Sequence, residues 1–96
     1  MLLTDIFNAI NVFPLRYFIN QIDKINALLG AGADLNVRKD TQTPLHAAAR
    51  MGNREIVELF LSKGAKKNVL DSNYFTASRI AEINGHRSIA ALIDNF

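Results

Sequence analysis

Two histidines, His46 and His86, are the side chains of this sequence best suited to acid-base or metal chemistry near neutral pH. They lie 40 residues apart, and the sequence contains no cysteine that could complete a zinc site. No two carboxylates have the paired spacing of a general acid and base, and no serine has the context of a nucleophile. This holds for the carboxylates Asp5, Asp23, Asp34, Glu55, Glu58 and Glu82 and for the serines Ser62, Ser72, Ser78 and Ser88. The sequence therefore predicts no catalytic residue, no metal site and no cofactor, and we expect a protein that is not an enzyme.

The centre of the chain predicts two short helices joined by a tight turn. Thr43-Pro44 can begin a helix over Leu45–Met51, which Gly52 stops. A second helix begins at Asn53 or Arg54, and a glycine suited to a helix end, Gly64, follows it. Its apolar residues at helical spacing are Ile56, Val57, Phe60 and Leu61. Each helix has fewer than roughly 12 residues, too few to persist alone in water, so the unit must stack on similar units.

The chain on either side of this unit repeats the pattern less closely. A short helix is expected from Thr4 to Asn11, ended by Pro14, and a longer amphipathic helix is expected over 15–29. Later in the chain, Thr76-Ala77-Ser78-Arg79 stands where the central unit has Thr43-Pro44-Leu45-His46. Such departures are typical of terminal repeats, which face solvent on one side.

The spacing of equivalent residues predicts an altered turn near residue 40. Asn36 and Asn68 are 32 residues apart, whereas Thr43 and Thr76 are 33 apart. The segment between Asn36 and Thr43 is therefore one residue short. It also carries Thr41 where a turn glycine is common, so a tightened first turn is expected.

The central unit resembles an ankyrin repeat. The matching residues are Thr43-Pro44-Leu45-His46, Ala48-Ala49, Gly52, Glu55-Ile56-Val57, Leu59-Phe60-Leu61 and Gly64-Ala65. The resemblance implies an all-α solenoid of stacked helix-turn-helix units joined by hairpin-like finger loops. It divides a single domain, 1–96, into an irregular N-terminal capping repeat (1–36), a central repeat (37–68) and a C-terminal capping repeat (69–96). It also implies that His46 belongs to the hydrogen-bond network of a helix start and is structural.

In this family the binding surface is formed by the fingers and the exposed side of the first helices, which implies protein binding at a set of twelve residues. They are Arg38, Lys39, Asp40, Gln42, Arg50, Met51, Ser72, Asn73, Tyr74, Phe75, Ile83 and Asn84. Arg, Tyr, Phe and Met are enriched in the cores of interfaces. An equally weighted interpretation is that Phe75 and Ile83 pack between repeats while Tyr74 only replaces the turn glycine.

Composition and charge fit a small compact domain, and the resemblance implies an unidentified protein partner and no small-molecule substrate. The chain has 96 residues, 49% hydrophobic and 21% charged, with a net charge of +2. This weak charge argues against a dedicated nucleic-acid binder. The alternative is weak binding of nucleic acid or another anionic surface through Arg38, Lys39, Arg50, Lys63, Lys66 and Lys67. For the lysines, solvated cations near a helix end are the favoured interpretation.

The sequence shows no secretory signal and no membrane-spanning segment. The first residues lack a basic region, and Asp5, Asn8 and Asn11 interrupt any apolar core. No run approaches the roughly 18 apolar residues of a transmembrane helix. A cytoplasmic location is expected, with delivery into a host cell left open.

Overall fold

The chain folds into short helices connected by ordered loops. The computed structural model describes residues 18–39 and 41–96. Its helices are α2 (Phe18–Gly30), α3 (Pro44–Met51), α4 (Arg54–Ser62), α5 (Ala77–Ile83) and α6 (Arg87–Asn95). In the described part of the chain, the one β-type contact is an isolated bridge between Lys39 and Gln42. The predicted all-α class is confirmed, while the expected helix over residues 4–11 and the stop at Pro14 lie outside the described residues.

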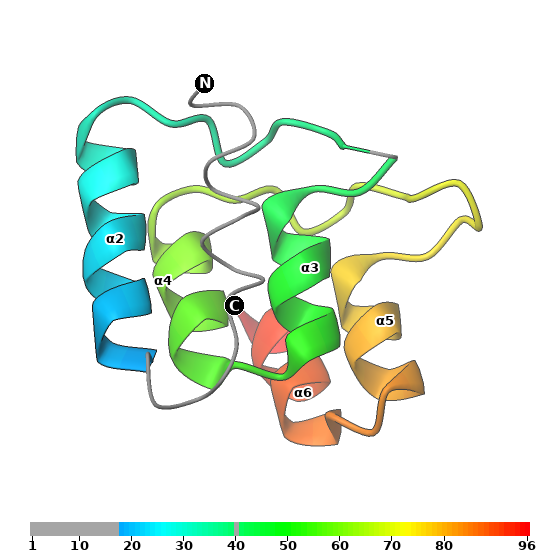
Figure 1. The fold of residues 1–96 in the computed structure, drawn as a ribbon. Coiled ribbons are helices and arrows are strands. Elements are labelled where there is room, and N and C mark those ends of the chain that lie inside the picture. Colours follow the sequence, from blue (N-terminus) through cyan, green and yellow to red (C-terminus); the bar gives the residue numbers. More distant parts are fainter. Residues whose placement is uncertain (1–17, 40) are drawn as a thin grey trace.

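The helices form two layers, with finger loops at one end. Figure 1 shows α3 and α5 side by side in one layer, with α4 and α6 behind them. The helix α2 lies on the side of α4 away from α6. The helix-turn-helix pairs α3/α4 and α5/α6 are therefore stacked, as the sequence predicted. The division of the chain at residues 36 and 68 stays a prediction.

The two first helices in the described part of the chain, α3 and α5, each begin at a threonine that caps the helix. Thr43 Oγ1 accepts a hydrogen bond from His46 N at 3.4 Å, and Thr76 Oγ1 accepts one from Arg79 N at 3.2 Å. Such caps satisfy N–H groups that have no partner within the helix. Because Thr76 supplies the same cap as Thr43, the third repeat begins its helix without the Pro-Leu-His residues of the central one.

Two second helices end in the same way at Gly32 and Gly64. Their φ angles are 95° and 93°, in the region where a side chain is strained. The residue after each glycine donates its N–H to a carbonyl five residues earlier, at 2.9 Å in both cases. This is the bond of a glycine-terminated helix. The agreement supports the equivalence of Asn36 and Asn68, each four residues after one of these glycines, on which the spacing argument was based.

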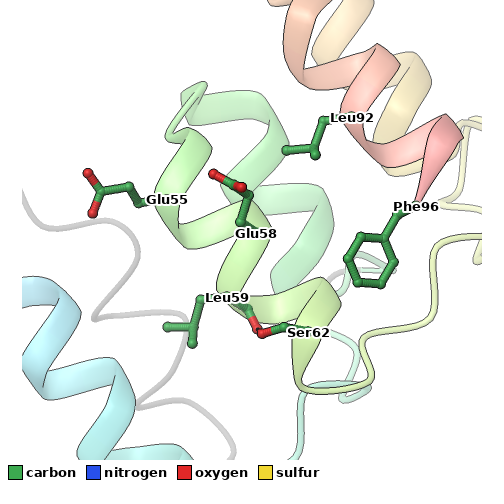
Figure 2. Close-up of a pocket in the computed structure, with 6 residues that line it drawn as sticks. All are labelled: Glu55, Glu58, Leu59, Ser62, Leu92 and Phe96. Carbon is green, nitrogen blue, oxygen red and sulfur yellow. The ribbon is translucent and has the colours of Figure 1, made fainter.

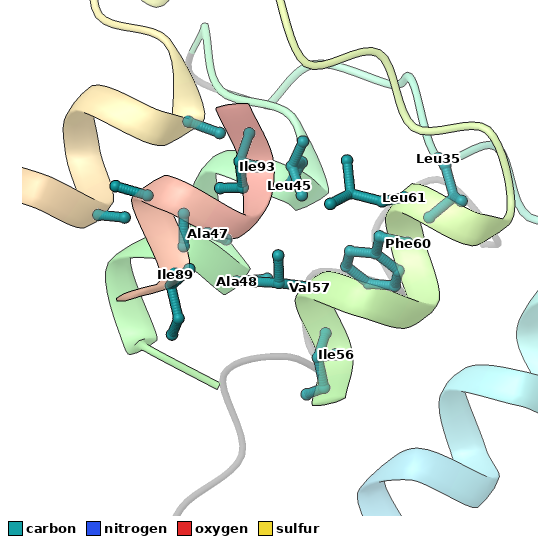
Figure 3. Close-up of a cluster of buried hydrophobic side chains, with 14 of the residues drawn as sticks. Leu35, Leu45, Ala47, Ala48, Ile56, Val57, Phe60, Leu61, Ile89 and Ile93 are labelled. Atoms are coloured by element: carbon teal, nitrogen blue, oxygen red, sulfur yellow. The ribbon is translucent and has the colours of Figure 1, made fainter. Parts of the chain in front are cut away.

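The core lies between the two layers. Figure 3 shows side chains of α3, α4 and α6 converging in one cluster. The large apolar side chains with 0–1% exposure are Phe60, Ile25, Leu45, Ile56, Ile93 and Val57. In α3 the central residues are three buried alanines, Ala47–Ala49. Small side chains let α3 approach its neighbours closely, which accounts for its position between α4 and α5.

The first finger is one residue shorter than the second. Lys39 N donates to Gln42 O at 2.8 Å, which closes a four-residue turn. Asp71 N donates to Phe75 O at 3.0 Å, which closes a five-residue turn. The difference of one residue confirms the tightened first finger predicted from the spacing.

Both fingers place a residue other than glycine in a left-handed conformation. Thr41 has φ of 68° and Tyr74 has φ of 64°. Such angles are uncommon for residues other than glycine, asparagine and aspartate. Tyr74 therefore does replace a turn glycine, and each finger tip holds a side chain at some cost in backbone strain.

Gly52, in the turn between α3 and α4, lies close to the imidazole of His86 in the next repeat. Gly52 has φ of 75°, and a Cβ atom added there would lie 2.5 Å from Cε1 of His86. Gly85 is the equivalent glycine 33 residues later, with φ of 83° and nothing within 4 Å of an added Cβ. Gly85→Ala should lower the free energy of unfolding by about 1 to 2 kcal/mol, through backbone strain alone. Gly52→Ala should lower it by up to about 1 kcal/mol more, because the half-exposed imidazole of His86 must turn aside.

Urea unfolding of the two variants measures this difference. Adding His86→Ala to Gly52→Ala should recover much of the extra loss. Equal losses for the two glycine variants would show that the close approach of His86 contributes nothing.

Candidate functional site

A groove runs along the layer formed by α3 and α5, next to the second finger. Its volume is about 170 Å³. It is lined by Gln42, Arg50, Asp71, Asn73, Phe75, Ile80, Ile83 and Asn84. Six of these eight belong to the twelve residues predicted to bind protein, and Asp71 and Ile80 do not. The groove therefore gathers residues from both repeats and from their fingers.

The apolar part of the groove consists of two isoleucines and a phenylalanine. Ile80 is buried with 4% exposure, whereas Ile83 is 53% exposed. Phe75 is half-buried. Ile83 therefore does not pack between repeats, and it presents apolar surface at the edge of the groove.

The polar part of the groove has free hydrogen-bonding capacity. Arg50 is exposed in the last turn of α3. Among the described residues it has no ion pair or hydrogen-bond partner. Asn84 Nδ2 donates to Ile80 O at 2.8 Å, which leaves the Asn84 side-chain oxygen available. A guanidinium and amide groups beside apolar surface are the mixture found in protein interfaces.

Asp71 orders the second finger from inside. Its Oδ1 accepts hydrogen bonds from Asn73 N at 2.8 Å and from Phe75 N at 2.9 Å. Its Oδ2 lies 3.4 Å from the Nε2 donor of Gln42 on the first finger. The sequence reasoning missed Asp71, although an aspartate that begins a turn commonly bonds to the N–H groups that follow it.

The free energy of unfolding should depend on pH through the ionisation of the Asp71 carboxylate. The pKa of Asp71 lies below its ordinary value of 3.8, because the N–H of Phe75, then those of Asn73 and Gln42, stabilise the charged form against the opposing effect of burial. A lowered pKa in the folded chain gives stability that is fully present above about pH 4. That stability is lost as the pH falls through the lowered value. The free energy of unfolding should therefore decline in acid.

Asp71→Asn is the matched control, since an amide of the same shape does not ionise. Urea unfolding at pH 7, 5, 4 and 3 should show a steeper acid decline for the native chain than for the variant. Parallel declines would mean that the Asp71 carboxylate is not specifically stabilised by folding.

His46 joins the start of α3 to the second finger. Its Nδ1 accepts from Thr43 N at 3.2 Å, so the proton of a neutral ring lies on Nε2 and is donated to Phe75 O, 3.0 Å away. Thr43 Oγ1 also lies 2.8 Å from Nδ1. With 1% exposure, the ring has no access to a substrate. This geometry supports the structural role that the resemblance implied.

Removal of His46 should therefore lower stability. His46→Ala leaves Thr43 N and Phe75 O, both bonded by the ring, without this partner, so we expect a loss of about 1 to 3 kcal/mol or more. Arg50→Ala on the same helix should change stability by less than about 0.5 kcal/mol, because Arg50 is exposed. Thermal unfolding followed by circular dichroism compares the two variants. An unchanged midpoint for His46→Ala would contradict the structural role.

The other predicted binding residues lie outside the groove. Lys39 and Ser72 are exposed on the fingers, and Tyr74 is 81% exposed at the tip of the second finger. Met51 is half-buried and packs against the core. Asp40 lies outside the described residues. The predicted set is therefore divided between the groove and the fingers above it.

Arg38 holds the two fingers together. Its guanidinium donates to Thr41 O at 3.0 Å and to Leu70 O at 2.6 Å. Ser72 N donates to Thr41 Oγ1 at 3.0 Å. The fingers thus form one connected surface.

The expectation that all three lysines are solvated cations was wrong for Lys67. Its Nζ donates to Ile93 O and Asp94 O, both at 3.3 Å, in the last turn of α6. The last carbonyls of a helix lack partners within it, so they attract a cation. Lys63 and Lys66 are exposed, as expected.

A larger hollow of about 450 Å³ lies in the other layer, between α4 and α6 (Figure 2). It is lined by Glu55, Glu58, Leu59, Ser62, Leu92 and Phe96. Glu58 pairs with Arg54 at 3.5 Å, and Ser62 Oγ donates to Leu59 O. The Glu55 carboxylate points away from Leu92 and Phe96 in Figure 2. These side chains therefore form no acid-base pair or activated nucleophile.

The described residues contain neither a metal-binding cluster nor a membrane-spanning helix. No cluster of three or more His, Cys, Asp or Glu in residues 18–39 and 41–96 could hold a metal ion. No helix in the same ranges is long and apolar enough to cross a membrane.

The stacked helix pairs, the fingers and the Thr43 cap define a helical repeat protein, and comparison with known families agrees. The family model for ankyrin repeats (3 copies) matches residues 15–95. The chain belongs to the ankyrin-repeat family, whose repeats generally act as protein-protein interaction modules.

Relatives carry the repeats within much longer chains. The chain is 41% identical over 61 residues to ARF GTPase-activating protein Git of Drosophila melanogaster, which covers 62% of this chain and 8% of that protein. It is 40% identical over 70 residues to ankyrin repeat and KH domain-containing protein mask-1 of Caenorhabditis elegans, covering 72% of this chain and 3% of that protein. The chain thus spans less than a tenth of these relatives.

Proposed function

We propose that this chain is a non-enzymatic interaction module that binds another protein through its groove and fingers. The observation that carries the proposal is the groove between α3 and α5. It gathers six of the predicted binding residues, among them an exposed isoleucine, Ile83, and an exposed arginine, Arg50. Exposed apolar surface with a polar rim is the composition of a protein interface.

The helices and fingers would present this surface already formed. The second finger is fixed by Asp71 and His46, and Arg38 ties it to the first finger. Binding to an ordered surface loses little conformational entropy. A standard interface takes about 800 Å² from each partner, so one protein or peptide segment would occupy most of a face this size.

Small-molecule and nucleic-acid ligands fit the groove less well. Its volume of about 170 Å³ is below the roughly 300 to 1,000 Å³ of most small-molecule sites. Two of the six cations named for the anionic alternative, Arg38 and Lys67, donate hydrogen bonds to backbone carbonyls. A nucleic-acid binder would instead direct a concentrated row of cations to phosphates. A location inside a cell stays a prediction.

Affinity capture with two matched triple variants tests the proposal. The groove variant combines Arg50→Ala, Tyr74→Gly and Ile83→Ala; glycine at residue 74 also relieves the left-handed backbone. The control variant changes three exposed residues of the other layer, Glu55, Glu58 and Arg87, to alanine. Circular dichroism should first show that both are folded.

We expect a protein from a soluble cell extract to be retained by the native chain and by the control variant, and lost by the groove variant. If only the control variant fails to retain the protein, the binding site lies on α4 and α6. If the chain retains nucleic acid and no protein, and does so only at low salt, the alternative of weak binding to nucleic acid or another anionic surface is favoured.

A further inference from the structure

We propose that the groove between α3 and α5 binds an extended peptide segment in which an acidic residue lies next to a large apolar residue. This inference rests on the proposed function and names the chemistry of the partner. It is drawn from the charges, the apolar surface and the amide groups that line the groove.

The charge on this face is positive and not neutralised by the described residues. Arg50 lies in the groove, and Arg38 and Lys39 lie on the adjacent finger; all three are exposed. The one carboxylate in the groove, Asp71, is buried and accepts hydrogen bonds from N–H groups. Glu82 on α5 is paired within its own helix. A carboxylate on the ligand is therefore the complement that the groove lacks, and it can accept two parallel bonds from one guanidinium.

The apolar surface fits one side chain beside this carboxylate. Ile83 is 53% exposed, and Phe75 and Ile80 form the adjoining wall. A hollow of about 170 Å³ holds a few water molecules, each of which takes roughly 30 Å³ in the liquid. Replacing such water by a leucine, isoleucine, methionine or phenylalanine side chain buries apolar surface on both partners.

The amide side chains suit the backbone of an extended segment. Asn73, Asn84 and Gln42 lie along the groove, and each amide group both donates and accepts hydrogen bonds. Asn84 and Gln42 each use an N–H within the chain, which leaves their oxygens to accept from peptide N–H groups. Asn73 has no side-chain partner among the described residues. An extended peptide exposes both N–H and C=O groups along its backbone. The amide side chains can accept from the former and donate to the latter.

A single arginine in the groove favours a carboxylate over a phosphate. A phosphate group carries nearly two negative charges and three acceptor oxygens, and its sites commonly use clusters of arginines. Arg38 is not available in full, since its guanidinium already donates to Thr41 O and Leu70 O.

Selection from a library of random linear peptides displayed on phage tests the inference. The folded native chain is the target, and synthetic copies of the enriched peptides are then titrated by fluorescence polarisation. We expect enriched sequences with Asp or Glu within two positions of a large apolar residue. Replacing that acidic residue by its amide should weaken binding at least tenfold.

Two variants with the same charge change locate the effect. Arg50→Glu should weaken binding of these peptides at least tenfold and should select peptides with Lys or Arg in the acidic position. Lys66→Glu, on an exposed residue outside the groove, should change binding by less than twofold. Circular dichroism checks that both variants are folded.

The possible results separate this inference from the proposed function. Peptides that are lost with Ile83→Asp but show no acidic preference would overturn the inference and leave the groove as a protein-binding site. Peptides that bind the native chain, Arg50→Glu and Ile83→Asp equally would overturn both. A phosphorylated peptide preferred over its acidic counterpart would overturn the inference in favour of a phosphopeptide. No enrichment would show that a short segment is not the ligand, while affinity capture would still decide the proposed function.

Discussion

The hydrogen bond from His46 Nε2 to Phe75 O fixes the second finger to the start of α3, while Arg38 and Thr41 bond the two fingers to each other. The ring that makes this bond also accepts from Thr43 N, so one side chain fixes the start of α3 and the height of the next finger. Phe75 and Asp71 belong to that finger and are joined by a hydrogen bond, and both line the groove. His46 is buried and cannot contact a partner. It nevertheless positions the residues of the surface that we propose binds the partner.

Several contacts between neighbouring repeats share a direction. Five side chains of an earlier repeat bond to backbone atoms 26 to 32 residues later: Asn36, Arg38, Thr41, His46 and Lys67. Gln42 differs, because it approaches a side chain, that of Asp71. A backbone group is supplied by almost any residue, so the later repeat needs few particular side chains to be joined. This explains why Thr76-Ala77-Ser78-Arg79, without the proline, leucine and histidine of the central repeat, still stacks on it.

The fold was predictable from the sequence because its signals are local. A threonine cap, a helical period and a left-handed glycine each act within a few residues, and the 32-residue and 33-residue spacings gave the length of the first finger. The site was less predictable, because it depends on which side chains meet across repeats. Phe75 and Ile83 could have been buried between helices, and only the arrangement of α3 and α5 shows that Ile83 is exposed. Lys67 was misread because its acceptors on α6 are 26 residues away in the chain.

The shared direction of these contacts also means that the order of the repeats matters. Arg79 occupies the position of His46 in the third repeat. Its guanidinium donates a hydrogen bond to Glu82 within the same helix and does not make the bond that His46 makes to a finger carbonyl. A chain in which the last two repeats were exchanged would contain the same helices and nearly the same apolar surface. It would nevertheless place Arg79, and not His46, before the next finger, so the junction between these two repeats would lose the bond from the imidazole to a finger carbonyl. Duplication of the central repeat would supply a histidine for this bond at the new junction, whereas duplication of the third repeat would supply Arg79 there.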